Sequence, residues 1–411
     1  MSSRTAARPT RRSGDATTHA QRAATVAAFV GHGLLFASWT AHIPQVKDRL
    51  GLTDGTLGLA LLGAPIGSVV AMLVVARILP RLGSKRMVQI SLLGYSLAGP
   101  LVGLAGSLAA LSVALFAWGA FQGTLDVSMN TQAVTVERTA ARPLMSGFHA
   151  CWSIGAFAGA GIGALGVAAG LSLTPQLLLL AVPVLLIAGG LTTRMLPDPA
   201  SIEPDPASSK LASTGGSAGR QVRARRTAAR LSRPVLVLGA IAFASMLCEG
   251  ASADWASVYL RGSIHVSAGE AGLGYTTFAL MMVLVRLSGN WLLTAFPRRR
   301  LLPALAIMAT AGFTAGLLGG SPASVLAGFG CLGIGLALVI PTVNSAAGRL
   351  PGLSPGAAIA MVSAWGWAGF VFGPPIIGEL ASATSLTAAL CILPVLTACI
   401  AYGTRRQILT D

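Results

Sequence analysis

The sequence predicts an all-α integral membrane protein, in which twelve transmembrane helices form two pseudo-symmetric six-helix bundles around a central cavity. Three observations predict this fold class: the composition, the recurrence of long apolar stretches, and an internal repeat. Of the 411 residues, 54% are hydrophobic and 10% are charged, and the mean hydropathy is +0.72. Soluble domains carry about 25% charged residues, so lipid rather than water must surround most of this chain.

Apolar stretches long enough to cross a membrane recur along the whole chain. A helix needs roughly 18–25 such residues to cross about 30 Å of hydrocarbon. The short alternating segments that are typical of a membrane β-barrel do not occur. We predict twelve helices, at residues 22–42, 57–76, 87–106, 109–135, 144–169, 176–193, 234–260, 273–296, 301–320, 324–347, 357–378 and 387–403.

The sequence repeats itself without gaps at an offset of 214 residues. This offset aligns Gly58 with Gly272, and it aligns Asn130 with Asn344 in a chain that has only three asparagines. A period of half the chain indicates a duplicated domain rather than a solenoid. In membrane proteins, such a duplication is typical of two bundles that move about a shared site near the middle of the bilayer.

A segment rich in Pro, Ser, Gly and Arg separates the two halves. It spans residues 195–233 and is interpreted as a basic cytoplasmic linker. This linker divides an N-terminal six-helix bundle at 22–194 from a C-terminal six-helix bundle at 234–403. We expect a disordered cytoplasmic tail at 1–21 and a second cytoplasmic tail at 404–411.

The basic residues indicate the orientation of the chain rather than a nucleic-acid partner, although the net charge is +16. Of 29 Lys and Arg residues, only Lys47, Arg49 and Arg261 fall on the side opposite to the termini. Cytoplasmic loops carry an excess of Lys and Arg, so both termini are expected in the cytoplasm. We therefore predict a multi-pass protein of the bacterial plasma (inner) membrane that contacts lipid and functions as a monomer.

The fourth predicted span carries polar residues on one face. Gln122, Asp126 and Asn130 follow i, i+4, i+8 spacing, and Asp126 lies about 16 Å along the helix from Glu137 at the cytoplasmic end. Polar groups at such depth face a bundle interior or a wet cavity. A carboxyl group there favours its protonated form unless a cation stands beside it. Asp126 is thus a candidate for proton coupling, with a permanent salt bridge as the alternative, and Gln122 and Asn130 are candidate substrate ligands.

The eighth span carries Arg286 at a similar depth, with Asn290 one turn further on the same face. Because Arg stays charged, it needs a partner: Asp126 across the halves, Glu249 in the seventh span, or an anionic group of the substrate. A structural pair of Arg286 with Glu249 is one interpretation. The other is that Arg286 exchanges partners as a proton or substrate arrives. Asp126, Glu249 and Arg286 are therefore the candidate proton-coupling residues, and Asn290 is a candidate substrate ligand.

Further candidates for substrate contact come from the histidines and tryptophans of the polar spans. His32 and His149 could titrate near pH 6.5, although packing as neutral side chains is an equal alternative for His149. Trp152 and Trp365 could stack on a ring-shaped solute. Asn344, the repeat partner of Asn130, completes the candidate set.

The sequence carries no sign of a cofactor or of an enzymatic site. No two histidines have the spacing of metal ligands, and no nucleophile and base form a recognisable pair. The three lysines are Lys47, Lys85 and Lys210, and none follows a glycine as a phosphate-binding loop requires. Any driving force for transport must therefore be an ion or solute gradient.

Twelve spans, a basic central linker and two equivalent halves resemble the major facilitator superfamily, over roughly residues 22–403. The motif of that family between its second and third helices is Gly-x-x-x-Asp-Arg-x-Gly-Arg-(Lys/Arg). Arg81, Gly83 and Lys85 match this motif, whereas Ala76 and Pro80 replace its glycine and aspartate.

Within the family, the pair Asp126-x-x-x-Asn130 resembles the fucose-permease-like branch of proton-coupled sugar symporters. The runs 146–155 and 249–255 are similar to a poorly characterised bacterial subgroup of this branch. The resemblance implies that Asp126 is the protonation site. The aspartate that fucose permeases carry in their first helix is missing here, and His32 is the ionisable group deep in that span.

The expected function is secondary active transport of a small solute by alternating access. Proton-coupled symport of a sugar-like or other small polar compound is the leading hypothesis. Export of a drug or metabolite, driven by protons, is the first alternative. A transport-inactive receptor on the same scaffold is the second.

Overall fold

The computed structural model describes residues 11–140, 144–197, 233–350, 353 and 355–406. Within these residues, twelve helices or helix pairs are long and apolar enough to cross a membrane. Each coincides with one of the twelve stretches predicted from the sequence. The linker expected at 195–233 lies almost entirely outside the described residues.

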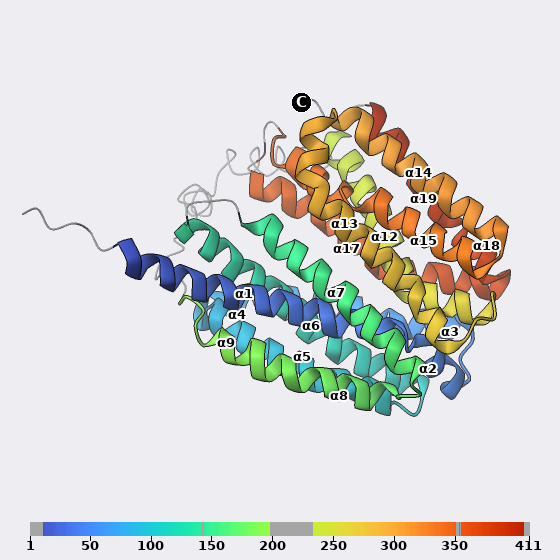
Figure 1. Cartoon of the computed structure of the whole chain (residues 1–411), viewed down its shortest axis with the longest axis horizontal. Coiled ribbons are helices and arrows are strands. Elements are labelled where there is room, and N and C mark those ends of the chain that lie inside the picture. The colour runs from blue at the N-terminus through green and yellow to red at the C-terminus, as the bar shows by residue number, and fades with distance from the viewer. Residues whose placement is uncertain (1–10, 141–143, 198–232, 351–352, 354, 407–411) are drawn as a thin grey trace, which may run out of the picture.

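The N-terminal half contributes six spans, and its helices follow one another through short turns (Figure 1). A short helix after the first span, α2 (Ile43–Leu50), covers one end of the bundle. The spans are formed by α1 (Arg11–Thr40), α3 (Asp54–Leu61) with α4 (Gly63–Leu82), α5 (Ser84–Leu104), α6 (Leu108–Ala140), α7 (Met145–Ala168), and α8 (Leu173–Pro183) with the π-helix η1 (Val184–Gly189) and α9 (Gly190–Thr192).

The C-terminal half contributes the other six spans. They are formed by α12 (Arg233–Gly262), α13 (Ala268–Ala295), α14 (Arg298–Gly319), α15 (Pro322–Leu336) with α16 (Val339–Ala347), α17 (Pro355–Ala383), and α18 (Leu386–Leu390) with α19 (Ile392–Arg406).

Prolines explain where spans divide into two helices. A proline has no N–H to donate, and its ring clashes with the carbonyl group four residues earlier. The second span breaks at Leu62, three residues before Pro65, and the tenth breaks at Leu338, three residues before Pro341. The last span breaks at Cys391, between α18 and α19, which is again three residues before a proline, Pro394. Each break is therefore encoded locally and bends a span without ending it.

The first helix begins earlier than expected. Residues 1–21 are expected to form a disordered tail, but α1 begins at Arg11, and residues 1–10 lie outside the described part. The segment at 11–21 contains two Arg, two Ala and one Gln, which are good helix formers, among residues of lower helix propensity. Once the apolar span nucleates the helix, adding residues at its end costs little, so the helix extends outward from the membrane.

The two halves repeat the same packing. In the first half, α1 packs on α7, α4 on α6, and α5 on α8; in the second, α12 packs on α17, α13 on α15, and α14 on α19. Each pair in the second list is the equivalent, by position among the six spans, of a pair in the first. The predicted pair of pseudo-symmetric bundles is therefore confirmed.

The helices divide into lipid-facing spans and spans that meet between the bundles. The third, sixth, ninth and twelfth spans expose large apolar side chains, among them Leu104, Leu186, Leu318 and Val395. Exposed leucines at these positions suit a hydrocarbon solvent. The contacts between the two halves come mainly from α7 against α13 and from α3 against α17.

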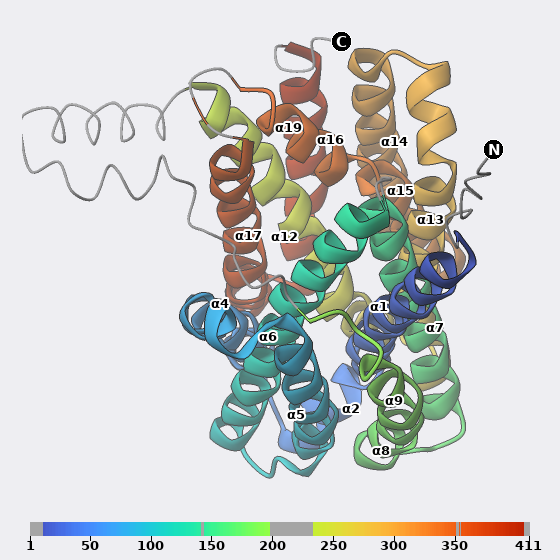
Figure 2. The same ribbon diagram turned by 90° about the vertical axis from the view of Figure 1, so that its left-hand side faces the viewer.

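The two ends of the molecule differ in how the bundles meet (Figures 1 and 2). We call the end that holds Arg11, Pro197, Arg233 and Arg406 the terminal end, and the opposite end, with α2, α3 and α18, the distal end. The ribbons of the two bundles converge at the distal end and separate toward the terminal end. Figure 2 views the molecule from the terminal end, with α17, α12 and α13 facing α4, α6 and α7.

Candidate functional site

A cavity of about 300 Å³ lies between the two bundles, which is a volume suited to a small solute. Its lining comes from the first, second, fourth, fifth, seventh, eighth, tenth and eleventh spans. The polar and ionisable lining residues are His32, Ser68, Gln122, Asp126, Asn130, His149, Glu249, Asp254, Tyr275 and Arg286. Eight of the eleven predicted site residues line this cavity.

The fourth span supplies one polar wall. Gln122, Asp126 and Asn130 lie on successive turns of α6 and all line the cavity, as their spacing predicts. The amide of Asn130 donates to the Asp126 carboxylate at 3.1 Å and to the Asp126 carbonyl oxygen at 2.8 Å. These bonds hold the Asp126 side chain along the helix, partly exposed toward the cavity.

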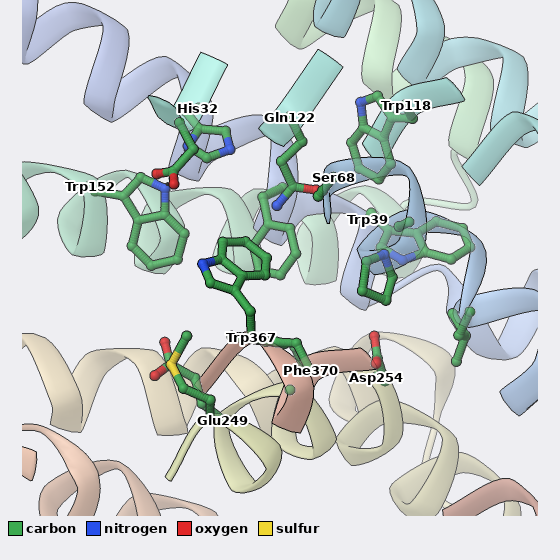
Figure 3. Close-up of a pocket in the computed structure, with 18 of the residues that line it drawn as sticks. His32, Trp39, Ser68, Trp118, Gln122, Trp152, Glu249, Asp254, Trp367 and Phe370 are labelled. Carbon is green, nitrogen blue, oxygen red and sulfur yellow. Dashed lines mark hydrogen bonds between the residues drawn. The ribbon is translucent and has the colours of Figure 1, made fainter. Parts of the chain in front are cut away.

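An aromatic and imidazole group forms a second wall (Figure 3). The indole N–H of Trp152 donates to Nδ1 of His32 at 3.0 Å, so neutral His32 carries its proton on Nε2. His32 itself is 3% exposed and lies edge-on to Tyr95. This bond fixes the orientation of the Trp152 ring, which reaches the cavity. His149 is exposed and packs edge-on against Phe29, at the terminal side of Trp152.

Arg286 joins the two halves at this site. Its Nη2 lies 4.0 Å from Oε2 of Glu249, at the limit of an ion pair, and its Nη1 donates to Oγ of Ser153 at 2.7 Å. Its Nε donates to the carbonyl oxygen of Ala337 at 3.3 Å. Ser153 belongs to α7 of the first half, whereas Glu249 and Ala337 belong to the second half. The predicted Arg286–Glu249 pair is therefore present but loose, and the stronger hydrogen bond crosses between the bundles.

Two of the predicted site residues whose side chains the structure describes do not line the cavity. Trp365 is 45% exposed and packs against Gly239 of α12, and Asn344 lies outside the lining. The side chain of Asn290 lies outside the described residues. The expectation that Trp365 and Asn344 contact the solute from the cavity wall is therefore not met. For Trp365, the reason is the geometry of the helix. Residues two apart on a helix point about 200° apart, so Trp367 rather than Trp365 faces the cavity.

Several lining residues escape prediction from the sequence. Ser68 comes from the second span, where a single serine gives no polar pattern, and its hydroxyl donates to the carbonyl oxygen of Gly119 at 2.8 Å. Trp118 is 2% exposed and stacks on Tyr95. Asp254 could have been predicted from the sequence, because an acidic residue within a membrane span is rare and usually faces a cavity. Its place one turn from Gly250 on α12 brings it to the cavity.

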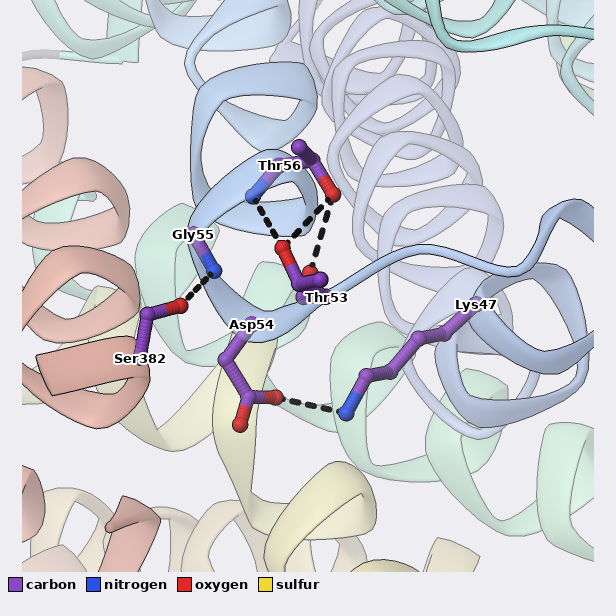
Figure 4. A network of polar contacts seen from close by, with 6 residues as sticks. All are labelled: Lys47, Thr53, Asp54, Gly55, Thr56 and Ser382. Carbon is purple, nitrogen blue, oxygen red and sulfur yellow. Dashed lines mark hydrogen bonds and ion pairs between the residues drawn. The ribbon is translucent and has the colours of Figure 1, made fainter. Parts of the chain in front are cut away.

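The distal end of the cavity is closed by contacts between the halves. The backbone N–H of Gly55 donates to Oγ of Ser382 at 2.7 Å (Figure 4), and Oγ of Ser257 donates to the Thr40 carbonyl oxygen at 2.6 Å. A salt bridge of 2.6 Å between Lys47 and the neighbouring Asp54 ties α2 to the start of α3. The structure therefore presents the cavity with its distal side shut.

The site has the features of a solute-binding cavity with exchangeable protons. Carboxyl, imidazole and amide groups converge on it, together with aromatic rings that include Phe36, Trp152 and Trp367. In the part of the chain that the structure describes, no group of three or more His, Cys, Asp or Glu residues is arranged to hold a metal ion. The arrangement offers hydrogen-bonding and aromatic groups that could contact a small molecule, and carboxyl groups that could hold a proton.

Comparisons with known proteins agree on the family. Residues 24–262 match the model of the Major Facilitator Superfamily. An uncharacterised MFS-type transporter of Yersinia pestis is 31% identical over 94% of this chain and 95% of its own length. The membrane protein MosC of Rhizobium meliloti is 31% identical over 89% of this chain and 84% of its own length.

Solved structures of transporters share the fold at low sequence identity. A D-xylose-proton symporter superposes with a TM-score of 0.72 at 13% identity, over 95% of this chain and 98% of its own. The transporter FucP in its outward conformation superposes with a TM-score of 0.62 at 18% identity, over 95% and 99%. The nucleoside transporter NupG gives a TM-score of 0.66 at 12% identity, over 94% and 98%.

Proposed function

This chain belongs to the major facilitator superfamily of secondary transporters, and we propose that it moves a small polar solute by alternating access in symport with protons. A multi-pass transporter of this family is not an enzyme, so the residues of the cavity bind and release rather than catalyse. The proposed substrate is a sugar-like or other small polar compound. The cavity volume of about 300 Å³ supports a solute of that size.

The observation that carries the proposal is the environment of Asp126. Its carboxyl group faces the cavity, and the partner it holds is the amide of Asn130 rather than a cation. A carboxyl group that is not fixed in an ion pair can exchange a proton with water in the cavity, as a proton carrier must. This environment supports Asp126 as the protonation site, and it argues against a permanent salt bridge there.

Arg286 and Glu249 are proposed as the elements that couple the proton to the movement of the bundles. In this state, Arg286 donates to Ser153 of the opposite half and is only loosely paired with Glu249. If the bundles separate along α7 and α13, Arg286 loses Ser153 and needs a new partner. Exchange between Ser153, Glu249 and a bound solute would link the conformation to the occupancy of the site.

We further propose that the terminal end is cytoplasmic, so that this structure is the inward-facing state. The excess of Lys and Arg on that side supports this orientation, and the distal contacts of Gly55 and Ser257 support closure of the external side. The domain organisation proposed is a bundle at 22–194, a cytoplasmic linker and a bundle at 234–403. The bacterial relatives support location in the bacterial plasma membrane.

Export of a drug or metabolite is a second candidate function. Trp39, Trp118, Trp152 and Trp367 all line the cavity, and aromatic walls favour flat apolar solutes as well as sugar rings. In symport the protons cross the membrane in the same direction as the solute, whereas in proton-driven export they cross in the opposite direction. The direction can therefore be decided by the same experiment that tests coupling.

The experiment has two steps. A panel of small solutes is first tested by thermal shift on the purified protein, because a ligand that binds only the folded state raises the melting temperature. A solute that raises it is then applied to proteoliposomes that contain a pH-sensitive dye. Symport predicts that solute entry acidifies the lumen, whereas export by exchange predicts that protons move against the solute.

The decisive variant is Asp126→Asn, which removes the exchangeable proton and keeps the size of the side chain. We expect solute binding to persist and solute-driven proton movement to disappear. Asp48→Asn, at an exposed position of α2, is the matched control and should transport normally. Proton movement that persists in the Asp126→Asn variant would rule out this carrier. A wild-type protein that binds solute without moving it would support the transport-inactive receptor.

A further inference from the structure

The cavity contains more acidic groups than basic ones. Its lining includes three carboxyl groups, from Asp126, Glu249 and Asp254, against a single guanidinium group from Arg286. Asp126 is bonded to Asn130, and Glu249 faces Arg286. Within the described residues, Asp254 makes no hydrogen bond or ion pair to the protein. Asp254 is thus the acid of this site that the described residues leave without a partner, and it is free to pair with a solute.

Two aromatic rings of α17 pack near Asp254, one turn away along α12. Asp254 lies one turn beyond Gly250 on α12, and a Cβ atom at Gly250 would lie 2.7 Å from the Phe370 ring. The absence of a side chain at Gly250 therefore lets this ring lie against α12, one turn from the carboxylate. Trp367, one turn before Phe370 on α17, packs against it with ring centroids 5.8 Å apart. Both rings are partly exposed to the cavity.

The two walls of the cavity differ in chemistry (Figure 3). Glu249 and Asp254 lie on one wall, with Trp367 and Phe370 between them. Ser68, Gln122 and Trp39 lie on the opposite wall. A carboxylate beside aromatic faces forms an environment that attracts a cation, because the ring quadrupole and the negative charge act in the same direction. Gln122 on the other wall offers an amide to the uncharged part of a solute.

Anionic solutes suit this site poorly. The guanidinium of Arg286 uses two of its N–H groups on Ser153 and Ala337, and the carboxylate of Glu249 faces it, so its positive charge is already shared with groups of the protein. An anion would also have to approach Asp254 without a compensating charge. A cation meets no such cost, since it would replace water at a carboxylate that lacks a partner.

We propose that Asp254, together with Trp367 and Phe370, recognises a protonated amine on the transported solute. This inference rests on the proposed function, and it narrows the substrate class from small polar compounds to those that carry an amino group. The carboxylate would accept hydrogen bonds from the ammonium group, and the two rings would contact its remaining N–H or C–H edges. The position of Asp254 near the closed distal end, three residues before Ser257, places the amine deepest in the cavity.

Matched pairs of amines and neutral analogues test the proposal directly. Glucosamine with glucose, and ethanolamine with ethylene glycol, are compared by thermal shift on the full-length protein. The proposal predicts that the amines raise the melting temperature of the protein, and that their neutral partners bind at least about tenfold more weakly. Asp254→Asn should lose the preference for the amine, because it keeps the size of the side chain and removes the charge.

Two further variants control for folding. Asp254→Glu keeps the charge and should retain the preference for amines, although with altered affinity. Asp48→Asn makes the same chemical change at an exposed position outside the cavity and should leave every shift unchanged. If Asp254→Asn does not fold, the Glu variant and the comparison of amine with neutral analogue in the wild type still decide the question.

The outcomes separate this inference from the function on which it rests. Stabilisation by the neutral compounds in preference to their amine partners would overturn the assignment of an amine and leave transport intact. Amine binding that survives Asp254→Asn unchanged would also overturn it. If the amines do not shift the melting temperature while other solutes of the wider panel do, the assignment of an amine is overturned and the proposed function stands; if no solute of either panel binds, the proposed function falls with the inference.

Discussion

Gly58 of α3 lies directly against Gly378 of α17, where the two bundles meet at the distal end. A Cβ atom at Gly58 would lie 3.1 Å from Cα of Gly378 and 2.6 Å from the carbonyl oxygen of Pro374. The offset of 214 residues relates Gly58 to Gly272 and Ala164 to Gly378. A Cβ atom at Gly272 would lie 2.8 Å from Cα of Ala164. The sequence repeat therefore corresponds to two equivalent close contacts across the interface.

This contact predicts the effect of a side chain at Gly58. Gly58→Leu should force α3 away from α17, since the neighbouring atoms are backbone and cannot move aside. Overpacking of this kind costs about 1–3 kcal/mol, and the cost falls on the state with a closed distal end. Spin labels attached at positions Asp48 and Ala383 report the separation of the two halves at the distal end. Their distance, measured by double electron–electron resonance, should therefore lengthen, and transport should fall.

Gly161→Leu is the matched control for this change. Gly161 lies within α7, and a Cβ atom added there would have no neighbour within 4 Å, so a larger side chain has room to begin from. The label distance and transport should stay as in the wild type. An unchanged distance in the Gly58 variant would mean that the closed distal end tolerates a wider separation, and the close-contact argument would be wrong.

The sequence predicts the scaffold well because its signals are local or repeated. Twelve apolar stretches appear as twelve spans, and the repeat appears as matching helix pairs. The breaks near Pro65 and Pro341 follow from the chemistry of proline. The start of α1 at Arg11 is harder to predict, because the end of a helix depends on how far a nucleated helix extends into solvent.

Arg286 provides the second prediction, through its contacts with both halves. Arg286→Met should leave Glu249 facing the cavity without a cation and remove the hydrogen bond to Ser153. Loss of one partner of a buried pair destabilises proteins by about 3–5 kcal/mol. The Arg286 and Glu249 charges lie 4.0 Å apart and both side chains are partly exposed. We therefore expect a smaller loss of stability here, of about 1–2 kcal/mol.

A double-mutant cycle tests whether Arg286 and Glu249 act as a pair. The variants are Arg286→Met, Glu249→Gln and the combination, and the observable is the melting temperature of the purified protein. A pair in contact should show a coupling of at least about 0.5 kcal/mol, with the double variant more stable than the sum of the single changes. Strict additivity would mean that Ser153, and not Glu249, is the partner that matters in this state.

The contacts in Figure 4 give the third prediction, which concerns the distal closure. Ser382→Ala removes the hydrogen bond from the backbone N–H of Gly55 and should favour opening of the distal end. Lys47→Met removes the salt bridge to Asp54, whose two side chains are each 22% exposed. That pair lies within one half and is accessible to salt, so it should contribute no more than about 1 kcal/mol.

The two variants are distinguished by solvent access to the distal side. A cysteine at Thr56, in a background that lacks the native cysteines, should react faster with a membrane-impermeant maleimide in the Ser382→Ala variant. Lys47→Met should leave this rate close to that of the wild type. Equal acceleration in both variants would mean that the ion pair, and not the contact between halves, holds the distal end closed.

The fourth prediction concerns pH and rests on His42, which lies beyond the end of the first span. His42 is 1% exposed, and its Nε2 lies 2.8 Å from Oε1 of Gln176. Burial lowers the pKa of His42 below its ordinary value, and the hydrogen bond to Gln176 opposes this shift without cancelling it. The folded protein therefore binds this proton less readily than the unfolded chain.

The sign of the pH effect follows from that difference. As the pH falls below about 6.5, the unfolded chain takes up the proton first, so the free energy of unfolding decreases. The melting temperature should fall between pH 7 and pH 5, and part of this fall should be absent in His42→Gln, which can still donate to Gln176. An identical fall in both proteins would assign the acid sensitivity to other groups.

The candidate site is predicted less completely than the scaffold. The i, i+4, i+8 pattern of Gln122, Asp126 and Asn130 correctly predicts three residues of the cavity lining. A polar face of a membrane helix is costly in lipid, so it must turn toward the bundle interior or a wet cavity. Asn344 shares the repeat with Asn130 and yet lies outside the lining. The tenth span breaks at Leu338, and this break alters the face that the residues beyond it present. Pseudo-symmetry of the backbone therefore does not imply symmetry of the site.

Two tryptophans of α17 supply the last prediction, because they are close in sequence and differ in surroundings. Trp367 lines the cavity beside Phe370, whereas Trp365 is 45% exposed and packs against Gly239. Trp367→Leu should weaken solute binding by about three- to tenfold, the value of one lost aromatic contact of about 0.5–1.5 kcal/mol. Trp365→Leu keeps an apolar side chain facing lipid and should bind solute like the wild type. Titration of tryptophan fluorescence with the solute found by thermal shift measures both affinities. A larger loss in the Trp365 variant would mean that the solute does not reach the wall between Glu249 and Asp254.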